Sequence, residues 1–496
     1  MKVTLIYLDQ LSAMHPTGVL YLATYLHEKG FSVDIIGIDP KNKNAKAEFI
    51  SEIEKSKPDM VGISLVTRNA DRIGRITEVI KQMFPKCFIV CGGPHPTVLP
   101  ELTLKQNPLL DCVAIGEGEI IMLELSQRIK DKRGISDVKG IAFQKQGKVY
   151  FTEPQPYIQN LDILPFPNRA LLRIDITPVL RSPYLPLPPP QLDLMAVRGC
   201  PYKCSFCYST ASKIFGSKIR SRTPENVIAE LKLLKKNYNI KGAQIGADTF
   251  TATRKWALRF CDLLIQEKLN IRWYVNARID NVDEDILKMM KKAGCEVITL
   301  AIESGSDRIR NDVLNKKVSR EQISRAFELA NKVGILTQAN IMVGSPTETI
   351  EDLEDSIKLI DLLEPDFLNS SYSSILPGTT LWEKYSDKLH FNSWSELDIE
   401  VPKQILHTIQ VERLAEARAY LETNYARYGK HSLKKFLTKS VFRNIMLYRW
   451  LCYLKVRPQN ILGDIYLFSK VALRSKAKSY EEYLTTRKDI ATHSVF

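Results

Sequence analysis

Short apolar runs alternate with amphipathic helical segments from the first residues of this 496-residue chain. In the N-terminal part the apolar runs have the length of buried strands, and the segments between them place apolar residues on one helix face. Strands are expected at 3–8, 33–38, 60–65, 88–90 and 112–115, and helices at 18–28, 47–53 and 72–84. This alternation predicts an α/β domain of the Rossmann-like, doubly wound kind, with helices on both faces of a parallel sheet.

The alternation stops at a proline-rich stretch and then begins again. A hairpin is expected at 140–143 and 148–151, and seven prolines follow within 164–167 and 183–190, which predicts a stiff connector. Further strands are expected at 192–197, 243–247, 272–276, 297–302, 337–343 and 367–375. Six strand–helix units predict a (β/α)6 partial TIM barrel, whose chemistry would lie at the carboxyl ends of the strands.

These patterns divide the chain into four parts. We expect a doubly wound domain over residues 1–135, a hairpin and proline-rich linker over 136–190, and a partial barrel over 191–380. The remainder, 381–496, has a mostly helical pattern. In parallel α/β sheets ligands bind outside the carboxyl ends of the strands, so both α/β parts are candidate binding domains.

The positive charge of the chain is concentrated near its C-terminus. The formal net charge is +14, and the window 427–476 holds twelve Lys and Arg against one acidic residue, Asp464. Apolar and aromatic residues such as Phe436, Leu447 and Trp450 recur there at roughly helical spacing. The alternatives are a helical lid over the barrel and an interfacial helix on anionic lipid. Nucleic acid is disfavoured because the rest of the chain is nearly neutral and shows no RNA-binding module.

The sequence also bears on the compartment of the protein. No stretch of about 18 apolar residues is present, and the first residues lack the apolar core of a signal peptide. Nine cysteines are too few for a disulfide scaffold in a chain of this length. We therefore expect a cytoplasmic protein, with peripheral contact at the inner face of the membrane through 427–476 as an alternative.

Three of the nine cysteines lie within eight positions, directly after the first expected barrel strand. Cys200, Cys204 and Cys207 have the spacing C-x3-C-x2-C. Thiolates are ligands for iron–sulfur clusters and for zinc. A structural zinc site needs four protein ligands, and no fourth Cys or His is near in the sequence. Three ligands on a four-iron cluster would leave one iron open for a small molecule. We interpret the other six cysteines, at 87, 91, 112, 261, 295 and 452, as small buried apolar residues.

This cysteine motif at the end of a barrel strand resembles that of the radical S-adenosylmethionine (SAM) superfamily. The run Arg198-Gly199-Cys200-Pro201-Tyr202-Lys203-Cys204 is similar to the form in the branch that carries a cobalamin-binding domain, and the resemblance extends from residue 1 to about 380. It implies a [4Fe-4S] cluster on Cys200, Cys204 and Cys207, with SAM on the fourth iron.

The resemblance also implies SAM contacts at the ends of later barrel strands. These residues are Asp248, Asn276, Arg278, Glu303, Ser304 and Gly344. Two of them have plain structural alternatives, because Asp248 could cap the next helix and Arg278 could lie on the surface. Glu348, in the turn Gly344-Ser345-Pro346-Thr347-Glu348, is expected to cap the helix that follows.

In the N-terminal domain the resemblance implies a cobalamin site at the strand ends. The expected contacts are Gly18, Ser64, Thr67, Gly92, Gly93, His95, Gly116, Glu117 and Gly118. The Asp-x-His-x-x-Gly motif that supplies a lower axial His in other cobalamin proteins is absent, so a contact to the nucleotide tail is expected for His95 rather than cobalt ligation. No Gly-x-Gly-x-x-Gly opens the first helix, which disfavours a dinucleotide.

The resemblance implies that the protein is an enzyme. Three functions remain as alternatives, the third of them without catalysis. The first is methylation of an unactivated carbon of a small molecule, in which a 5′-deoxyadenosyl radical removes hydrogen and methylcobalamin supplies the methyl group. The second is a cyclisation or ring rearrangement without net methyl transfer, and the third is a corrinoid-binding sensor with an inert barrel. An electron donor such as flavodoxin or ferredoxin is implied, and a lipid or polyprenoid substrate would suit the membrane alternative.

Overall fold

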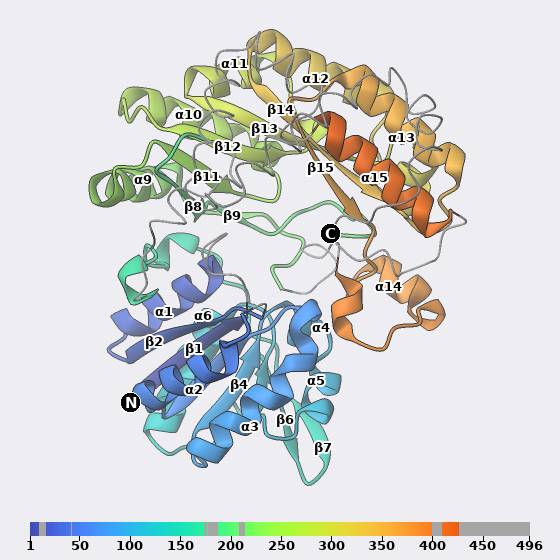
Figure 1. Ribbon diagram of the computed structural model, residues 1–496. Coiled ribbons are helices and arrows are strands. Elements are labelled where there is room, and N and C mark those ends of the chain that lie inside the picture. The colour runs from blue at the N-terminus through green and yellow to red at the C-terminus, as the bar shows by residue number, and fades with distance from the viewer. Residues whose placement is uncertain are drawn as a thin grey trace.

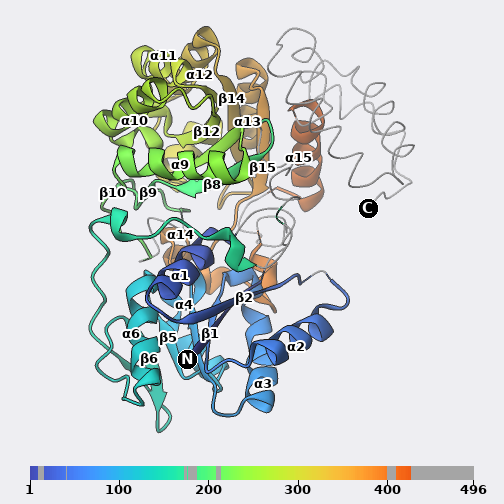
Figure 2. The same cartoon turned by 90° about the vertical axis from the view of Figure 1, so that its left-hand side faces the viewer.

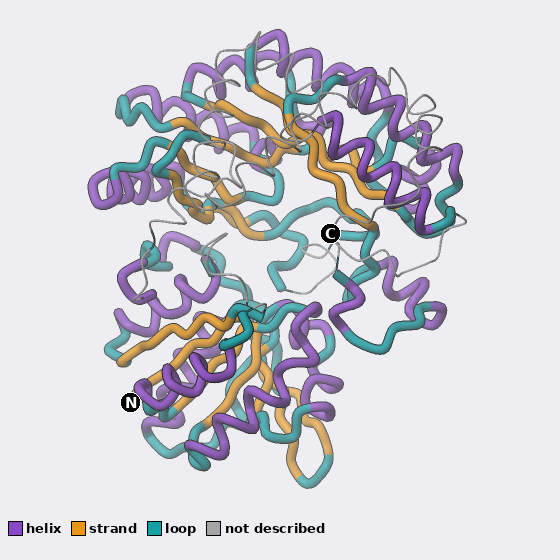
Figure 3. The backbone as a smooth tube through the Cα atoms, in the orientation of Figure 1, coloured by secondary structure: helices purple, strands orange, loops and turns teal. Residues whose placement is uncertain are grey.

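The computed structural model describes residues 1–8, 16–40, 42–172, 176, 187–207, 214–398 and 409–425. Two α/β bodies lie one above the other, with a sheet in each and helices outside it (Figures 1 and 3). The expected basic segment, 427–476, lies outside the described residues. Among the helices of the described part, none is long and apolar enough to cross a membrane.

The N-terminal body is built on a seven-stranded sheet with the order β2-β1-β3-β4-β5-β6-β7. The strands are β1 (Lys2–Leu8), β2 (Ser32–Ile38), β3 (Met60–Ser64), β4 (Phe88–Gly92), β5 (Cys112–Ala114), β6 (Ile141–Lys145) and β7 (Lys148–Phe151). β1 to β5 pair in parallel, whereas β6 and β7 add an antiparallel edge. The doubly wound parallel sheet predicted from the sequence is therefore confirmed, and the connection changes sides between β1 and β3, where such sheets bind ligands.

Helices cover both faces of this sheet because each buries one apolar stripe. They are α1 (Thr17–Glu28), α2 (Ala45–Ser56), α3 (Ile73–Met83), α4 (Pro94–Val98), α5 (Pro100–Gln106) and α6 (Gly118–Lys130), with a 3-10 helix, η1, at Thr67–Arg72. Residues of α1 and α6, such as Leu20 and Leu125, share one core with the sheet, and residues of α2 and α3, such as Ile53 and Ile80, share the other. Three helices of this domain, α4, α5 and α6, were not predicted. α4 and α5 both begin at a proline, whose fixed φ suits the first helical turn.

The hairpin that we placed in the linker extends the first sheet. β6 pairs with β5, and the turn at Gln146 and Gly147 has positive φ at both residues, as a two-residue hairpin turn requires. The chain then runs up the side of the N-terminal body towards the barrel (Figure 2), through two 3-10 helices, η2 (Leu161–Ile163) and η3 (Arg169–Leu172).

The second body is a six-stranded parallel sheet with helices on its outer side, as predicted. The order is β15-β14-β13-β12-β11-β8, so the sheet is a partial barrel with β8 and β15 at its two edges. Its strands are β8 (Gln191–Met195), β11 (Gly242–Gly246), β12 (Arg272–Ala277), β13 (Cys295–Glu303), β14 (Leu336–Val343) and β15 (Phe367–Tyr372). Its helices are α9 (Pro224–Tyr238), α10 (Arg254–Gln266), α11 (Glu284–Lys292), α12 (Arg320–Val333) and α13 (Ile350–Leu363), with the 3-10 turns η4 (Phe250–Ala252) and η5 (Ile279–Asn281) and a π-helix, η6, at Ile309–Val313.

After the barrel the chain returns to the N-terminal body. The segment contains α14 (Thr380–Tyr385), η7 (Ser386–Lys388) and η8 (Trp394–Leu397), and α14 lies near α4 in Figure 1. Trp394 and Leu397 belong to the same core as Ile63 and Cys91 of the first sheet. The last described helix, α15 (Val411–Tyr425), packs against β15 of the barrel, where Tyr420 donates a hydrogen bond to Asp361.

Candidate active site

The three clustered cysteines lie in a loop whose base is a short two-stranded ribbon. β9 (Val197–Arg198) pairs with β10 (Arg220–Ser221), so the loop between them carries Cys200, Cys204 and Cys207. Gly199 has φ +84°, and a Cβ on it would lie 2.3 Å from the carbonyl oxygen of Lys218. The loop also bonds to the barrel, where Ser205 N donates to Leu314 O at 2.9 Å, and to α14, where Ser205 O accepts from Leu381 N at 3.0 Å.

The loop places the three thiols close enough for the charge of one to affect the pKa of another. Burial, together with the nearby charges of Asp248, Cys207 and Cys204, raises the pKa of Cys200 to about 11. Burial also raises the pKa of Cys204, whereas the cations Lys316 and Arg278 lower it. No group of three or more His, Cys, Asp or Glu in the described residues is arranged to hold a single metal ion. A [4Fe-4S] cluster is a different kind of site, because its three thiolate ligands each bind a different iron.

Arg278 packs against the cysteine loop rather than lying on the surface. Its guanidinium donates to Cys204 Sγ at 3.6 Å and lies 3.9 Å from the centre of the Tyr202 ring. It also pairs with Asp280 at 2.8 Å and donates to the backbone oxygen of Lys316. The alternative of a surface arginine is therefore wrong, because the side chain holds the loop from the end of β12.

Glu303 ends β13 in an unusual backbone conformation. The register of β13 against β14 shifts between Ala301 and Glu303, and Glu303 itself has φ +71°. Its buried carboxylate accepts a 2.7 Å hydrogen bond from Lys316, which is 6% exposed. Sequence reasoning missed Lys316, because one lysine of a Lys-Lys pair in a loop carries no periodic signal of burial.

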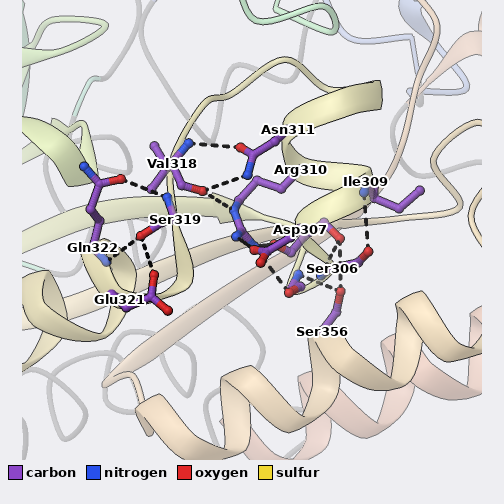
Figure 4. Close-up of polar contacts among 12 residues, drawn as sticks. Ser306, Asp307, Ile309, Arg310, Asn311, Val318, Ser319, Glu321, Gln322 and Ser356 are labelled. Carbon is purple, nitrogen blue, oxygen red and sulfur yellow. Dashed lines mark hydrogen bonds and ion pairs between the residues drawn. The ribbon is translucent and has the colours of Figure 1, made fainter.

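The loop between β13 and α12 is held rigid by its own polar contacts, drawn in Figure 4. Arg310 is fully buried and donates to the carbonyl oxygens of Val318 at 2.7 Å and Ser304 at 2.8 Å. Ser319 and Gln322 form a capping box at the start of α12. A Cβ on Gly305 would lie 2.4 Å from Ser356 Cα, so the chain passes α13 where only glycine fits. These contacts fix the position from which Lys316 reaches Glu303.

The turn after β14 contains a buried carboxyl group. Glu348 accepts hydrogen bonds from the backbone N–H of Gly344 at 2.5 Å and of Ser345 at 3.0 Å. Burial raises its pKa to about 8. The expectation that Glu348 caps the next helix is wrong, because Thr349 is the N-cap of α13 and forms a capping box with Asp352. Glu348 instead closes its own turn.

The remaining SAM candidates lie at the same ends of the strands. Asp248 follows β11 and is exposed; the N-caps that follow are Thr249 and Thr253, so Asp248 is not the expected helix cap. Asn276 lies on β12 and accepts from Tyr274 Oη at 3.2 Å. Ser304 follows Glu303, and its hydroxyl accepts from Ser306 N at 3.2 Å. A contact of these side chains with SAM stays a prediction.

A cavity of about 220 Å³ lies at the carboxyl ends of the first sheet, between α1 and α6. Seven of the nine expected cobalamin residues line it: Gly18, Ser64, Gly92, Gly93, Gly116, Glu117 and Gly118. Arg198, Ile214 and Phe215 from the neighbourhood of the cysteine loop also line it. Two positive-φ glycines, Gly93 (φ +98°) and Gly116 (φ +91°), let the backbone turn at this rim.

His95 and Thr67 are not among the residues that line this cavity. The His95 ring is 1% exposed, lies 3.3 Å from Thr67 Oγ1 and packs edge-on against Trp394 with ring centres 4.9 Å apart. Burial lowers the pKa of His95 to about 4. A contact between His95 and a nucleotide tail stays a prediction; in this structure the ring joins the N-terminal domain to the segment after the barrel.

Comparison with known proteins agrees with this geometry. Residues 6–126 match the B12 binding domain and residues 195–360 the radical SAM superfamily. An uncharacterized methyltransferase, PH0819, of Pyrococcus horikoshii is 34% identical over 369 residues, which cover 74% of this chain and 78% of the relative. The anaerobic magnesium-protoporphyrin IX monomethyl ester cyclase of Rubrivivax gelatinosus is 30% identical, covering 78% of this chain and 69% of the cyclase.

The fold also matches solved structures. The cobalamin-dependent SAM radical enzyme OxsB, with aqua-cobalamin and SAM bound, superposes with a TM-score of 0.70 at 16% identity, covering 98% of this chain and 78% of that one. A partial barrel with three cysteines after its first strand defines a radical SAM enzyme. More particularly, this chain belongs to the family of radical SAM enzymes that carry an N-terminal cobalamin-binding domain, whose cofactors are a [4Fe-4S] cluster, SAM and cobalamin.

Proposed function

We propose that this enzyme transfers a methyl group to an unactivated carbon of a small organic substrate. The observation that carries the proposal is that the cobalamin-domain cavity is lined by residues of both domains, Arg198 and Phe215 among them, so a corrinoid would lie beside the cysteine loop. The relative from Pyrococcus horikoshii carries the name of a methyltransferase. When bound, the three cofactors supply hydrogen abstraction and a transferable methyl group, while the protein positions them.

Different residues of the chain would hold the three cofactors. In this proposal Cys200, Cys204 and Cys207 hold the cluster. Arg278 and Lys316, two cations beside the loop, would attract the carboxylate of SAM, and the exposed carboxylate of Asp248 would accept from its amino group. The glycine-rich strand ends of the first sheet would hold the corrinoid, because they let its ring approach the backbone closely.

The inner face of the barrel supports a polar substrate. Val275, Ile298 and Ala339 belong to the core under the outer helices, so the residues that alternate with them face the inside. These inner residues include Tyr274, Asn276, Thr299, Gln338 and Asn340. They bond to one another, with Thr299 Oγ1 2.8 Å from Tyr274 Oη and Gln338 Nε2 3.4 Å from Asn340 Oδ1. Amide and hydroxyl groups would favour a substrate with hydrogen-bonding groups over a hydrocarbon.

The test is to count the products formed from SAM. Full-length protein, reconstituted without oxygen with cluster and cobalamin, would be given SAM with a deuterated methyl group, a reductant, and aqueous or organic metabolite extracts. Methylation requires S-adenosylhomocysteine and 5′-deoxyadenosine in equal amounts and a deuterated product, and a Cys204→Ala control should form neither deoxyadenosine nor the deuterated product. Deoxyadenosine without S-adenosylhomocysteine would contradict the proposal.

The alternative is a ring-forming reaction without net methyl transfer. The specific observation in its favour is the relationship to the magnesium-protoporphyrin cyclase of Rubrivivax gelatinosus. The same experiment separates the two functions, because a cyclase would consume one SAM per product and leave the deuterated methyl group in methionine.

Two further partners belong to this proposal. A one-electron donor such as flavodoxin or ferredoxin would reduce the cluster. The segment 427–476, which lies outside the described residues, would contact an anionic membrane surface if the substrate were a lipid or polyprenoid, and the protein would then be peripheral at the inner face of the membrane.

A further inference from the structure

Four charged side chains meet where the cobalamin-binding domain contacts the base of the cysteine loop. We name Glu117, Glu119, Arg198 and Arg220 the four-charge cluster. Arg198 pairs with Glu117 at 2.9 Å and with Glu119 at 2.6 Å, and Arg220 pairs with Glu117 at 2.9 Å. All four side chains are between 3% and 6% exposed. The cluster is therefore a buried, neutral contact between two domains.

The two arginines depend on the carboxylates of the other domain. Arg198 and Arg220 lie directly opposite each other on the paired strands β9 and β10. Like charges at opposed positions of a two-stranded ribbon repel each other. Glu117 lies between them and accepts from both, and its carboxylate also accepts from Ile158 N at 2.8 Å. The ribbon is therefore stabilised in this form when the start of α6 is docked against it.

The ribbon in turn determines where the cysteines lie. All three cysteines belong to the loop that β9 and β10 close, and Cys200 is two residues from Arg198. Glu119, Glu117 and Arg198 also line the cavity of the cobalamin-binding domain, together with Phe215, over whose ring the Arg198 guanidinium lies at 5.5 Å. One set of side chains thus forms a wall of the cavity and the base of the cysteine loop.

We propose that the four-charge cluster couples cobalamin binding to the placement of the [4Fe-4S] loop, with Arg198 as the positioning residue. A corrinoid in the cavity and a cluster on the loop would both favour the docked ribbon. Coupling between two sites is reciprocal, so each ligand tightens the binding of the other by the same factor. The inference rests on the cofactors of the family and is independent of whether the reaction is a methylation or a cyclisation.

The coupling is measurable in the unmodified protein. The Kd of hydroxocobalamin would be titrated by its absorbance change in full-length protein, once without iron and once with the cluster reconstituted. We expect tighter binding to the cluster-loaded protein, by a factor of about 5 to 150, the ordinary range for coupled sites. Equal values in the two states would overturn the inference.

A variant of Arg198 tests whether the coupling depends on the four-charge cluster. Arg198→Gln should retain iron on its three cysteines but bind hydroxocobalamin equally in both states, and its reduced-cluster EPR spectrum should no longer respond to cobalamin. Arg198→Lys should restore part of the difference. The control is Arg128→Gln near the end of α6, which breaks ion pairs with Glu124 and Asp137 away from the four-charge cluster, and it should behave as wild type. Wild-type coupling in Arg198→Gln would contradict the role of Arg198.

A double variant avoids the risk that Arg198→Gln fails to fold because it leaves the charge of Glu119 buried without its partner. In Arg198→Gln with Glu119→Gln no lone buried charge remains from that pair, and the contact between Glu117 and Arg220 is kept. This double variant should fold and also lose the coupling; if it kept the coupling, the inference would be wrong. None of these readouts uses the products of SAM, so failure of the methylation proposal would leave them unchanged.

Discussion

Gly199 determines whether the cysteine loop can form. Its φ of +84° is accessible to glycine at little cost, and the space for a Cβ is occupied by the carbonyl of Lys218. Gly199→Ala should therefore displace the loop and reduce the iron bound after reconstitution to well below that of wild type. Gly30→Ala is a matched control, because Gly30 has φ +85° but nothing within 4 Å of the added methyl group. If both variants bound iron equally, the close contact would not matter for the loop.

Glu348 makes stability depend on pH. Burial raises the pKa of its carboxyl group from 4.5 to about 8, so the folded protein keeps a proton that the unfolded chain has lost. The stabilisation from the neutral carboxyl is complete below pH 4.5 and is lost as the pH rises through 8.

We therefore expect the free energy of unfolding of wild type to fall relative to Glu348→Gln between pH 4.5 and 8. The slope should be at most about 1.4 kcal/mol per pH unit. Denaturant unfolding at several pH values measures it, with the exposed neighbour Glu351→Gln as the control. A difference between wild type and Glu348→Gln that is constant over this window would contradict the buried proton.

The 3-10 helix η8 joins the two domains from the side opposite the four-charge cluster. Trp394 is 8% exposed and packs against His95, Phe391 and Trp382, with ring centres 4.9, 5.1 and 6.2 Å away. Arg68 and Asp71 of η1 pair with Asp398 and Ser393 beside it. The segment after the barrel therefore stabilises the docking of the N-terminal domain.

Trp394→Ala should lower the free energy of unfolding by about 3–5 kcal/mol, the usual cost of removing a buried indole ring. Chemical denaturation followed by circular dichroism measures the loss. Tyr150→Ala on the hairpin is the control, because Tyr150 is 44% exposed and should cost far less. Equal losses in the two variants would show that the aromatic contact does not stabilise the docked segment.

Element boundaries were predictable where apolar periodicity is strong. The strands of both sheets lie at the predicted apolar runs, since each run is buried between the sheet and its helices. Some ends differ, as in β15, which was expected at 367–375 and ends at Tyr372. α4 and α5 were missed because they are short and have no apolar repeat, and only the prolines at their starts could have indicated them. α6 was also missed, although Ile121, Met122 and Leu125 of its buried face have helical spacing.

The basic segment bears on the protein as a whole. The charge of 427–476 is separated from a nearly neutral catalytic part, and aromatic and apolar residues are interspersed with it. If this segment binds anionic lipid, full-length protein should float with vesicles containing anionic lipid at low salt, and a version ending at Tyr425 should stay in solution. Vesicles of neutral lipid serve as the control. Full-length protein that stays unbound at low salt would contradict membrane contact.

The sequence by itself determined the class of the protein. Strand and helix periodicity depends on near neighbours, and the three cysteines are close in the chain, so the two α/β domains and the cluster motif could be recognised without a structure. The tertiary structure decided the rest: Lys316 beside Glu303, His95 against Trp394 and the four-charge cluster. Arg198 and Glu117 are 81 residues apart. Such pairings depend on how two domains dock and on which charges are buried between them. Neither can be predicted from the local sequence.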